Sequence, residues 1–421
     1  MKRIVVTGMG IVSPLGCGVN KVWERLINGQ SGINQAPEKL VKGIASHVVG
    51  SVPDAAEDVL GFDPSRLLSS KDIRKMDRFI QFAIAAADEA LLQANWHPQT
   101  EEKRNATATI IASGVGGFPA MAEATRKMEV SGARKVSPFL IPSFLINLAA
   151  GQVSIRYGFK GPIGAPVTAC AASAQSIGDG ARMIHSGEAD VVLCGGAEAG
   201  LDKVALAGFA AARALSTSFN DTPEKASRPF DQTRDGFVMS EGAGIMIIES
   251  MEHAIGRGST PLAELVGYGT TSDAFHITSG QPEGKGAAHA MKIALRQAQL
   301  EPKDINYINA HATSTPVGDA AEIAAIKSVF GSQFMGDISS TKSATGHTLG
   351  AAGAIESIFS IMSLRTGVIP PTINLEKPDE ISKGLNLIGS KAVKRQITYV
   401  LSNAFGFGGV NASLVFKKWN E

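Results

Sequence analysis

Cys170 stands where the sequence could activate a nucleophile. It follows the predicted strand end "APVTA" and precedes the small-residue run "AASAQSIGDGARMI", which predicts a helix over 171–186. Unpaired N–H groups and the helix dipole favour an anion at a helix start, so a thiolate there would have a lowered pKa. A free cysteine among small residues is also a common core residue. Placement alone leaves packing and chemistry both open.

Two histidines lie where α/β folds deliver catalytic groups. His311 follows the predicted strand "INYINA" in the loop "NAHATSTPVGD", and His347 lies in "TKSATGHTLGAAG" between a predicted strand and a predicted helix. Catalytic groups gather at the carboxyl ends of such strands. A lone histidine is more often structural, but two in Gly-, Ser- and Thr-rich loops favour catalysis. His276, in "SDAFHITSG", is a further candidate, and the HxxxH or CxxC spacing of a metal site does not occur.

Glu356 is the one charged residue between Thr348 and Leu364. An unpaired carboxylate in apolar surroundings costs several kcal/mol, so this segment predicts a cationic neighbour. Lys342, at the end of the predicted strand "DISSTK" that leads into this segment, is the candidate, and a bound monovalent cation is the other possibility. A helix turned so that Glu356 reaches solvent is the alternative.

Phe407 lies between glycines in "SNAFGFGGVN", a loop that joins two predicted strands. Glycines allow backbone conformations closed to other residues, which lets N–H groups face a ligand. A β-hairpin turn explains the same glycines.

Basic residues gather in two places in a chain whose net charge is only +1. Four of them have the spacing i, i+3, i+4 and i+7, which predicts one face of a helix: Lys71, Arg74, Lys75 and Arg78. Arg134 and Lys135 form the second cluster. Local basic patches on a neutral chain predict an acidic protein partner.

The elements that must position these residues alternate between strands and helices. Short β-branched runs at 3–8, 107–113, 190–195 and 244–250 alternate with Ala-rich stretches, which predicts an α/β fold with buried sheets. The order of elements begins again after about residue 255, so the second half looks like a copy of the first. The small-sided helices at 171–186 and 348–364 are therefore predicted to lie inside, between sheets.

Composition excludes several classes of protein. The 421 residues are 44% hydrophobic, and 40 Lys and Arg nearly cancel 39 Asp and Glu, which gives no reason to expect nucleic acid or an anionic membrane. No apolar run reaches the ~20 residues of a membrane helix. Three cysteines without CxxC spacing indicate a reduced compartment, the cytoplasm.

Five motifs in this order resemble the beta-ketoacyl-acyl carrier protein synthases, type II branch. They are "TACAAS" at Cys170, "RPFDQTRDGFV" at 228–238, "NAHATSTPVGD" at His311, "KSATGHTLGAAGAIES" at His347 and "SNAFGFGGVN". The resemblance runs nearly end to end. It implies a thiolase fold with two α/β halves, 1–255 and 256–421, in five αβαβα layers, as a homodimer.

The resemblance also implies an activity: decarboxylative condensation of malonyl-acyl carrier protein with a cysteine-bound acyl chain in fatty acid elongation. Cys170 would be the nucleophile, His311 and His347 would serve decarboxylation, and Lys342 with Glu356 would support them. Phe407 would gate the site and share the oxyanion hole with Cys170.

Further roles follow from the same resemblance. Substrate-binding positions would be Thr313, Thr315, Val115, Phe209, Thr278, His276 and Phe405. Positions facing the carrier protein would be Lys71, Arg74, Lys75, Arg134, Lys135 and Arg213. No organic cofactor is expected, and a monovalent-cation site would match Asn309, Glu356 and Asn403.

Ala312 departs from the family, which has glycine after the first histidine. Its methyl group could alter the loop's dihedral angles or crowd the pantetheine arm. Two other functions stay open: an acyltransferase or thioesterase that uses Cys170 without malonyl, and an inactive partner subunit. The joint presence of Cys170, His311 and His347 disfavours the second.

Overall fold

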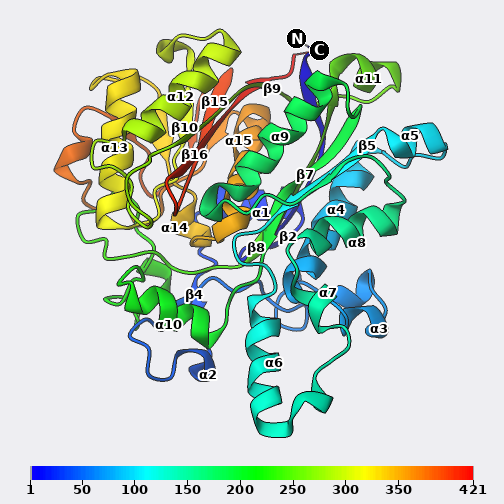
Figure 1. Ribbon diagram of the computed structural model, residues 1–421. Helices are drawn as coiled ribbons and strands as arrows, with labels where there is room; N and C mark the ends of the chain where they lie inside the picture. The colour runs from blue at the N-terminus through cyan, green and yellow to red at the C-terminus, as the bar shows by residue number, and fades with distance from the viewer. Residues whose placement is uncertain (1, 421) are drawn as a thin grey trace.

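A computed structural model of the chain describes residues 2–420 (Figure 1). Its main sheet has twelve strands: β1 (Ile4–Ser13), β2 (Gly16–Cys17), β5 (Thr107–Ala112), β6 (Ile163–Gly164), β7 (Val191–Glu198), β8 (Gly242–Ser250), β9 (Ala263–Ser272), β10 (Tyr307–Asn309), β11 (Asp337–Ser339), β13 (Asn386–Leu387), β15 (Tyr399–Gly406) and β16 (Val410–Lys418). Two small two-stranded sheets pair β3 (Asn34–Gln35) with β4 (Val48–Val49), and β12 (Val368–Ile369) with β14 (Val393–Lys394).

The order of the strands is symmetric about its middle. It runs β13-β11-β10-β15-β16-β9-β1-β8-β7-β5-β6, with β2 on β1. Outward from the antiparallel β1–β9 pair, each side has two antiparallel pairings and then parallel ones, two on the β1 side and three on the β9 side. This repeat confirms the duplication expected from the sequence. The division of the chain at residue 255 stays a prediction.

Helices fill three layers around these strands (Figure 1). The helices α4 (Arg78–Ala94) and α8 (Asn147–Tyr157) pack on strands of the first half, and α12 (Lys285–Ala298) packs on β9 and β16, with α13 (Pro316–Phe330) beside it. The helices α9 (Ala172–Ser186) and α15 (Ala352–Thr366) contact each other and strands of both halves. The expected αβαβα layering, with the two small-sided helices at its centre, is confirmed.

Small residues allow the central helices to meet. Every residue of α15 from Ala352 to Leu364 is buried. A side chain built on Gly353 would lie 2.8 Å from the backbone nitrogen of Ala174 in α9. The sequence predicted separate sheets, whereas Ile4–Val6 of β1 pair with residues 263–265 of β9 and join the halves into one sheet.

The remaining helices are short or peripheral: α1 (Val19–Ile27), α2 (Glu38–Val41), α3 (Ser70–Ile73), α5 (Glu101–Asn105), α6 (Phe118–Ser131), α7 (Leu140–Phe144), α10 (Lys203–Ala211), α11 (Met251–Gly256) and α14 (Lys342–Thr345). Figure 1 shows α6 projecting from the body of the molecule. No helix in the described part of the chain is long and apolar enough to cross a bilayer.

The prediction of one continuous basic helix is wrong. The chain breaks between α3 and α4, because Asp77 caps α4 by accepting the N–H of Phe79 and also accepts the N–H of Ala120. Arg78 turns inward, where its Nε lies 3.2 Å from Oε1 of the buried Glu241. The four basic residues therefore do not share one helix face.

Two predicted strands are also shorter than expected. The segment "APVTA" lies outside β6, which ends at Gly164, and β11 ends at Ser339. Lys342 accordingly begins the short helix α14 rather than ending a strand.

Candidate active site

Cys170 lies in a tight turn directly before α9. A 3₁₀ turn over Ala169–Ala171 leads into the helix, and Ala169 has φ 48°, in the left-handed region. The Cys170 side chain is partly exposed. The backbone N–H groups of Phe407 and of Cys170 itself lie close enough to the sulfur to favour its thiolate form. Both N–H groups expected to form an oxyanion hole therefore converge at the sulfur.

His347 faces the same sulfur. Its Nε2 lies 2.9 Å from Sγ of Cys170. Burial raises the pKa of the Cys170 thiol to about 12, against the opposing effects of Lys342 and the two N–H groups. The prediction of a lowered pKa is wrong, because desolvation of the thiolate outweighs the helix start. The thiol consequently needs a base when it attacks, and His347 is placed to take the proton.

His311 and His347 form a pair of neutral imidazoles. Their ring centroids are 5.3 Å apart at 85°, and the residues are 9% and 3% exposed. Burial, helped by the charge of Lys342, holds the pKa of both rings well below its usual value. A neutral imidazole keeps one N–H donor, so the pair can stabilise a developing oxyanion.

The ion pair of Lys342 and Glu356 lies buried behind the histidines. Burial raises the pKa of Glu356 to about 7, and Lys342 opposes this shift. Glu356 is 2% exposed, so the alternative in which it reaches solvent is wrong. The predicted pairing of these two residues is confirmed, and the positive charge of Lys342 disfavours protonation of the neighbouring histidines.

Sequence reasoning missed the carboxylates that hold the His311 loop. Glu322 in α13 accepts the backbone N–H groups of His311 at 2.9 Å and Ala312 at 2.7 Å, and Asn403 Nδ2 donates to it at 3.1 Å. Asp319 accepts the N–H of Ser314. The sequence signal is weak, because the i, i+3 spacing of Asp319 and Glu322 places them on one face of the helix after the loop but does not mark them as buried.

Ala312 fits its position without backbone strain. It is not among the non-glycine residues of positive φ within the described chain. Its side chain is 2% exposed and packs in an apolar cluster with Ile308 and Phe230. The concern that its methyl group alters the loop's dihedral angles is therefore not supported.

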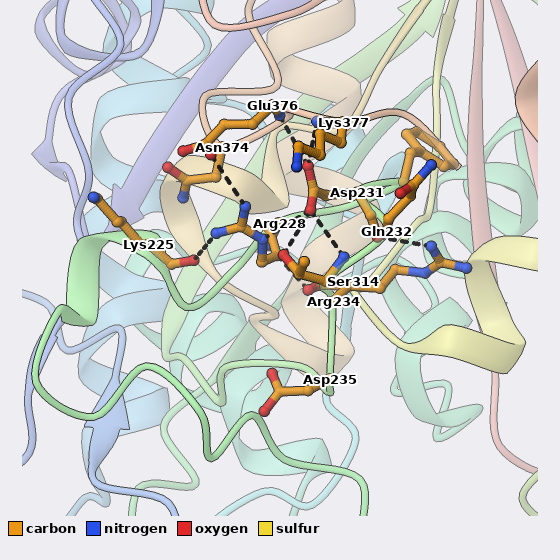
Figure 2. A network of polar contacts seen from close by, with 12 residues as sticks. Lys225, Arg228, Asp231, Gln232, Arg234, Asp235, Ser314, Asn374, Glu376 and Lys377 are labelled. Carbon is orange, nitrogen blue, oxygen red and sulfur yellow. Dashed lines mark hydrogen bonds and ion pairs between the residues drawn. The ribbon is translucent and has the colours of Figure 1, made fainter. Parts of the chain in front are cut away.

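The motif "RPFDQTRDGFV" braces the His311 loop from the first half. Figure 2 shows Asp231 between Arg228, whose Nε donates to it at 3.2 Å, and the N–H groups of Glu376 and Lys377, which donate at 2.9 and 2.7 Å. The N–H of Arg228 donates to Oγ of Ser314 at 3.0 Å. Although burial acts to raise the pKa of Asp231, hydrogen bonds from the N–H groups of Lys377, Thr233 and Glu376 and from the Thr233 hydroxyl lower it to about 2.

Five of the predicted substrate positions lie around this centre. Thr313 and Thr315 are partly buried with their hydroxyl oxygens 3.1 Å apart. The ring centroids of Phe405 and His311 are 5.7 Å apart, and those of Phe209 and Phe407 are 6.4 Å apart. Val115 is 37% exposed and lies in the segment that leads to α6.

The other two lie on an exposed loop. The N–H of Thr278 donates to Nδ1 of His276 at 3.2 Å, and both residues are exposed. The N–H of Gly408 donates to the carbonyl of Ile277 at 2.7 Å. The loop of His276 and Thr278 therefore touches the Phe407 loop rather than Cys170.

The predicted docking residues lie at the surface. Lys71, Arg74, Arg134, Lys135 and Arg213 are exposed, on or beside α3, the turn Ala133–Lys135 and the end of α10. Lys75 differs, because it is partly buried, pairs with Asp72 at 3.2 Å and lies over the ring of Phe139.

The predicted cation positions are buried and rich in oxygen. Both polar side-chain atoms of Asn309 and Oε2 of Glu356 have no hydrogen-bond partner among residues 2–420. The Oδ1 of Asn403 accepts from Ser413 at 2.8 Å. Within the same residues no group of three His, Cys, Asp or Glu is placed to hold a metal ion.

Comparison with known proteins agrees with this geometry. Family models of the beta-ketoacyl synthase N-terminal and C-terminal domains match residues 1–254 and 262–376. The chain is 47% identical to the 3-oxoacyl-[acyl-carrier-protein] synthase 2 of Rhizobium meliloti (strain 1021), covering 100% of this chain and 99% of that one.

Solved structures have the same fold. A beta-ketoacyl synthase from Burkholderia phymatum STM815 superposes with a TM-score of 0.91 at 35% identity, covering 100% of both chains. A type II polyketide ketosynthase solved in complex with its acyl-carrier protein gives 0.90 at 33% identity, covering 99% and 100%. The thiolase fold is confirmed, and the chain belongs to the beta-ketoacyl synthase family.

Proposed function

We propose that the protein elongates fatty acid chains by decarboxylative condensation. An acyl chain on Cys170 would join the two-carbon unit of malonyl-acyl carrier protein, giving 3-oxoacyl-acyl carrier protein and CO₂. One observation carries the proposal: the Cys170 sulfur lies 2.9 Å from Nε2 of His347, at the meeting point of two backbone N–H groups, with His311 beside it. Relatives named 3-oxoacyl-[acyl-carrier-protein] synthase 2 support it.

Acyl transfer comes first. The sulfur attacks the thioester carbonyl of the acyl donor, the S–C bond forms, and Nε2 of His347 takes the thiol proton. The carbonyl oxygen becomes an oxyanion, which the N–H groups of Cys170 and Phe407 are placed to meet. The bond to the carrier thiol then breaks, and His347 returns the proton to the leaving sulfur. Cysteine suits this step because a thiolate is both a nucleophile and a good leaving group.

Decarboxylation supplies the second nucleophile. When malonyl thioester loses CO₂, the electron pair of the broken C–C bond moves into an enolate. The N–H groups of the two neutral imidazoles stabilise the enolate oxygen. For this step the proton of His347 has to exchange from Nδ1, where it lies while Nε2 acts as the base, to Nε2. The enolate carbon attacks the acyl-Cys170 carbonyl, a new C–C bond forms, and the Cys170 sulfur leaves as a thiolate. It takes up one proton from solvent, which restores the resting thiol.

The acyl and malonyl groups would arrive on an acyl carrier protein. The exposed basic residues Arg74, Arg134 and Lys135 suit an acidic partner. Reversing charge at Arg74 and Lys135 is expected to raise KM for carrier-bound substrate more than for a small thioester. An equal rise for both substrates would contradict docking at this surface.

The proposal includes a homodimer in the cytoplasm. Apolar side chains of Ile155, Ile163 and Val167 are 75%, 54% and 53% exposed beside β6, the edge strand of the sheet. An exposed apolar edge favours association with a second copy. The three cysteines are free, as expected in a reduced compartment. Sedimentation of the purified protein tests the dimer, and a monomer at micromolar concentration would contradict it.

The proposal also retains a monovalent cation near Glu356. The unpartnered oxygen atoms of Asn309 and Glu356 suit a hard cation, and Asn403 lies on the neighbouring strand. A bound cation would add positive charge behind the histidines and keep them neutral. Replacing K⁺ and Na⁺ by a bulky organic cation at constant ionic strength is then expected to lower Tm, and Asn309→Ala is expected to remove that difference.

Product analysis tests the function directly. The protein is incubated with acyl- and ¹³C-malonyl-loaded acyl carrier protein, and the products are analysed by mass spectrometry. A 3-oxo product two carbons longer, with the label in the new unit, is expected. Acylated Cys170 without an extended product would indicate an acyltransferase, and free fatty acid would indicate a thioesterase.

A further inference from the structure

The turn before α15 repeats the turn before α9. A 3₁₀ turn over Leu349–Ala351 leads directly into α15, as Ala169–Ala171 leads into α9. Each turn begins with a non-glycine residue at φ 48°, and each is followed by a 15-residue helix. Gly350 therefore occupies in the second half the place of Cys170 in the first.

A carboxylate lies against this second turn. Glu198, at the end of β7, is fully buried. Four groups donate to it: the backbone N–H of Gly350 at 2.9 Å and, from the segment after β5, Oγ of Ser113 at 2.7 Å and the N–H groups of Gly114 at 2.7 Å and Val115 at 3.2 Å.

The hydrogen bonds of Glu198 favour its ionised form. Backbone N–H groups donate to both of its oxygens, Val115 to Oε1 and Gly350 to Oε2. An amide would place a hydrogen against one of these donors, whereas a carboxylate accepts from all of them. Burial raises the pKa of Glu198, and its four hydrogen bonds only partly offset this shift. No basic side chain among residues 2–420 forms an ion pair with it, so backbone dipoles hold a buried anion.

We propose that Glu198 is a positioning residue of the active site. Its ionised carboxylate fills, in the turn before α15, the place that a reaction oxyanion takes in the turn before α9. It thereby fixes the segment 113–116, which carries Val115, to the turn that follows His347. The inference rests on the proposed function only in that Cys170 is the reacting thiol.

Close packing supports this role. Side chains built on Gly114 or Gly350 would each lie 2.7 Å from Oε2 of Glu198, and one on Gly350 would lie 2.2 Å from the nitrogen of Gly114. The segment and the turn therefore touch through the carboxylate and their own backbones. Movement of Glu198 would move the Val115 wall relative to His347.

The charge of Glu198 also reaches the nucleophile. The groups that act on the Cys170 thiol are Lys342, which favours the thiolate, Glu198, which disfavours it, and the N–H groups of Phe407 and Cys170, which favour it. The rings of His311 and His347 are neutral. Removing the Glu198 charge should consequently make the thiol more reactive, which loss of packing alone would not do.

The rate at which iodoacetamide alkylates Cys170 tests the effect of the Glu198 charge on the thiol and does not require condensation. Glu198→Gln is expected to react about tenfold faster than the parent across neutral and mildly alkaline pH, as for a pKa lowered by about one unit. Glu89→Gln is the matched control, because Glu89 is also a carboxylate that accepts two backbone N–H groups, from Ile11 and Val19, and does not act on Cys170. Equal rates in Glu198→Gln, Glu89→Gln and the parent would overturn the charge effect.

Glu198→Asp separates charge from reach and decides the proposal if Glu198→Gln does not fold. It keeps the anion but shortens the side chain by one methylene, so the alkylation rate should stay near that of the parent. The KM for a long acyl donor should rise several-fold relative to a short one, because the Val115 segment is no longer held. An unchanged ratio of the two KM values would overturn the positioning role. The proposed function is tested separately, by alkylation of Cys170 and by condensation in the parent protein.

Discussion

The turn before α9 presents a cysteine side chain and two convergent N–H groups, whereas the turn before α15 presents Gly350 and is closed by the carboxylate of Glu198. Both turns use the same backbone device, N–H groups at the start of a buried helix, which attracts negative charge. In the second half the negative charge is permanent and belongs to the protein. In the first half the place is free for an oxyanion that exists only during the reaction.

The difference teaches how one duplicated element serves both stability and catalysis. A permanent anion fixes the turn before α15 and the segment 113–116 as a rigid wall. The turn before α9 instead lies close to the backbone of Gly406, where a side chain would come within 3.1 Å of the Cys170 nitrogen. Substitutions in the first turn should therefore affect the reaction, and those in the second should affect stability.

The largest expected effect is loss of condensation in Cys170→Ala. Without the sulfur no acyl-enzyme forms, and the rate of 3-oxo product formation should fall by at least about 10³-fold. The free energy of unfolding should hardly change, because alanine fits the space of the partly exposed cysteine. Product formation followed by mass spectrometry and thermal unfolding provide the two measurements. Normal condensation in this variant would contradict the assignment of the nucleophile.

Replacing the histidines separates the two half-reactions. His311→Ala should lower condensation by about 10²–10³-fold through the loss of one oxyanion donor, yet still become acylated on Cys170. His347→Ala should slow both steps, because its Nε2 lies 2.9 Å from the sulfur. Intact-protein mass spectrometry after brief exposure to acyl donor distinguishes them. If His311→Ala cannot be acylated, the assignment of His311 to the condensation step alone is wrong.

Gly350→Ala should affect stability more than chemistry. The added methyl would lie 2.2 Å from the nitrogen of Gly114 and 2.7 Å from Oε2 of Glu198, and the rigid backbone cannot yield cheaply. A loss of about 1–3 kcal/mol in the free energy of unfolding is expected. Gly208→Ala is the control, since that glycine has open space around its Cβ position. Equal stability of the two variants in urea unfolding would remove the contrast between the turns.

Much of the comparison could be predicted from the sequence. The small residues of 171–186 and 348–364 indicated two buried helices, and the lone charge of Glu356 indicated its pairing with Lys342. These predictions succeeded because side-chain size and an isolated buried charge leave few structural solutions. The family motifs then identified Cys170, His311 and His347, which the structure brings together.

The remaining features depend on contacts between distant segments. Glu198 and Glu322 gain their roles from backbone N–H groups of other segments, and nothing in "GGAEA" or "GDAAEIAAI" marks them as buried anions. The raised pKa of Cys170 likewise follows from desolvation in the folded protein. The basic-helix prediction failed because the spacing of Lys71 to Arg78 says nothing about the cap at Asp77.

The smallest expected effect is on how the free energy of unfolding depends on acid pH. It arises from Asp231, which links the first half of the chain to Glu376 and Lys377 in the second. Hydrogen bonds lower the pKa of Asp231 to about 2, so its contribution to stability is complete above the ordinary carboxyl pKa and is lost as pH falls towards about 2. Acid should therefore reduce the free energy of unfolding through Asp231, by roughly 2 kcal/mol at most. In Asp231→Asn that part of the acid dependence should vanish, and stability near neutral pH should be lower. Urea unfolding at several acidic pH values measures the slope. Parallel slopes for the parent and Asp231→Asn would show that the acid dependence comes from other carboxylates and not from this brace.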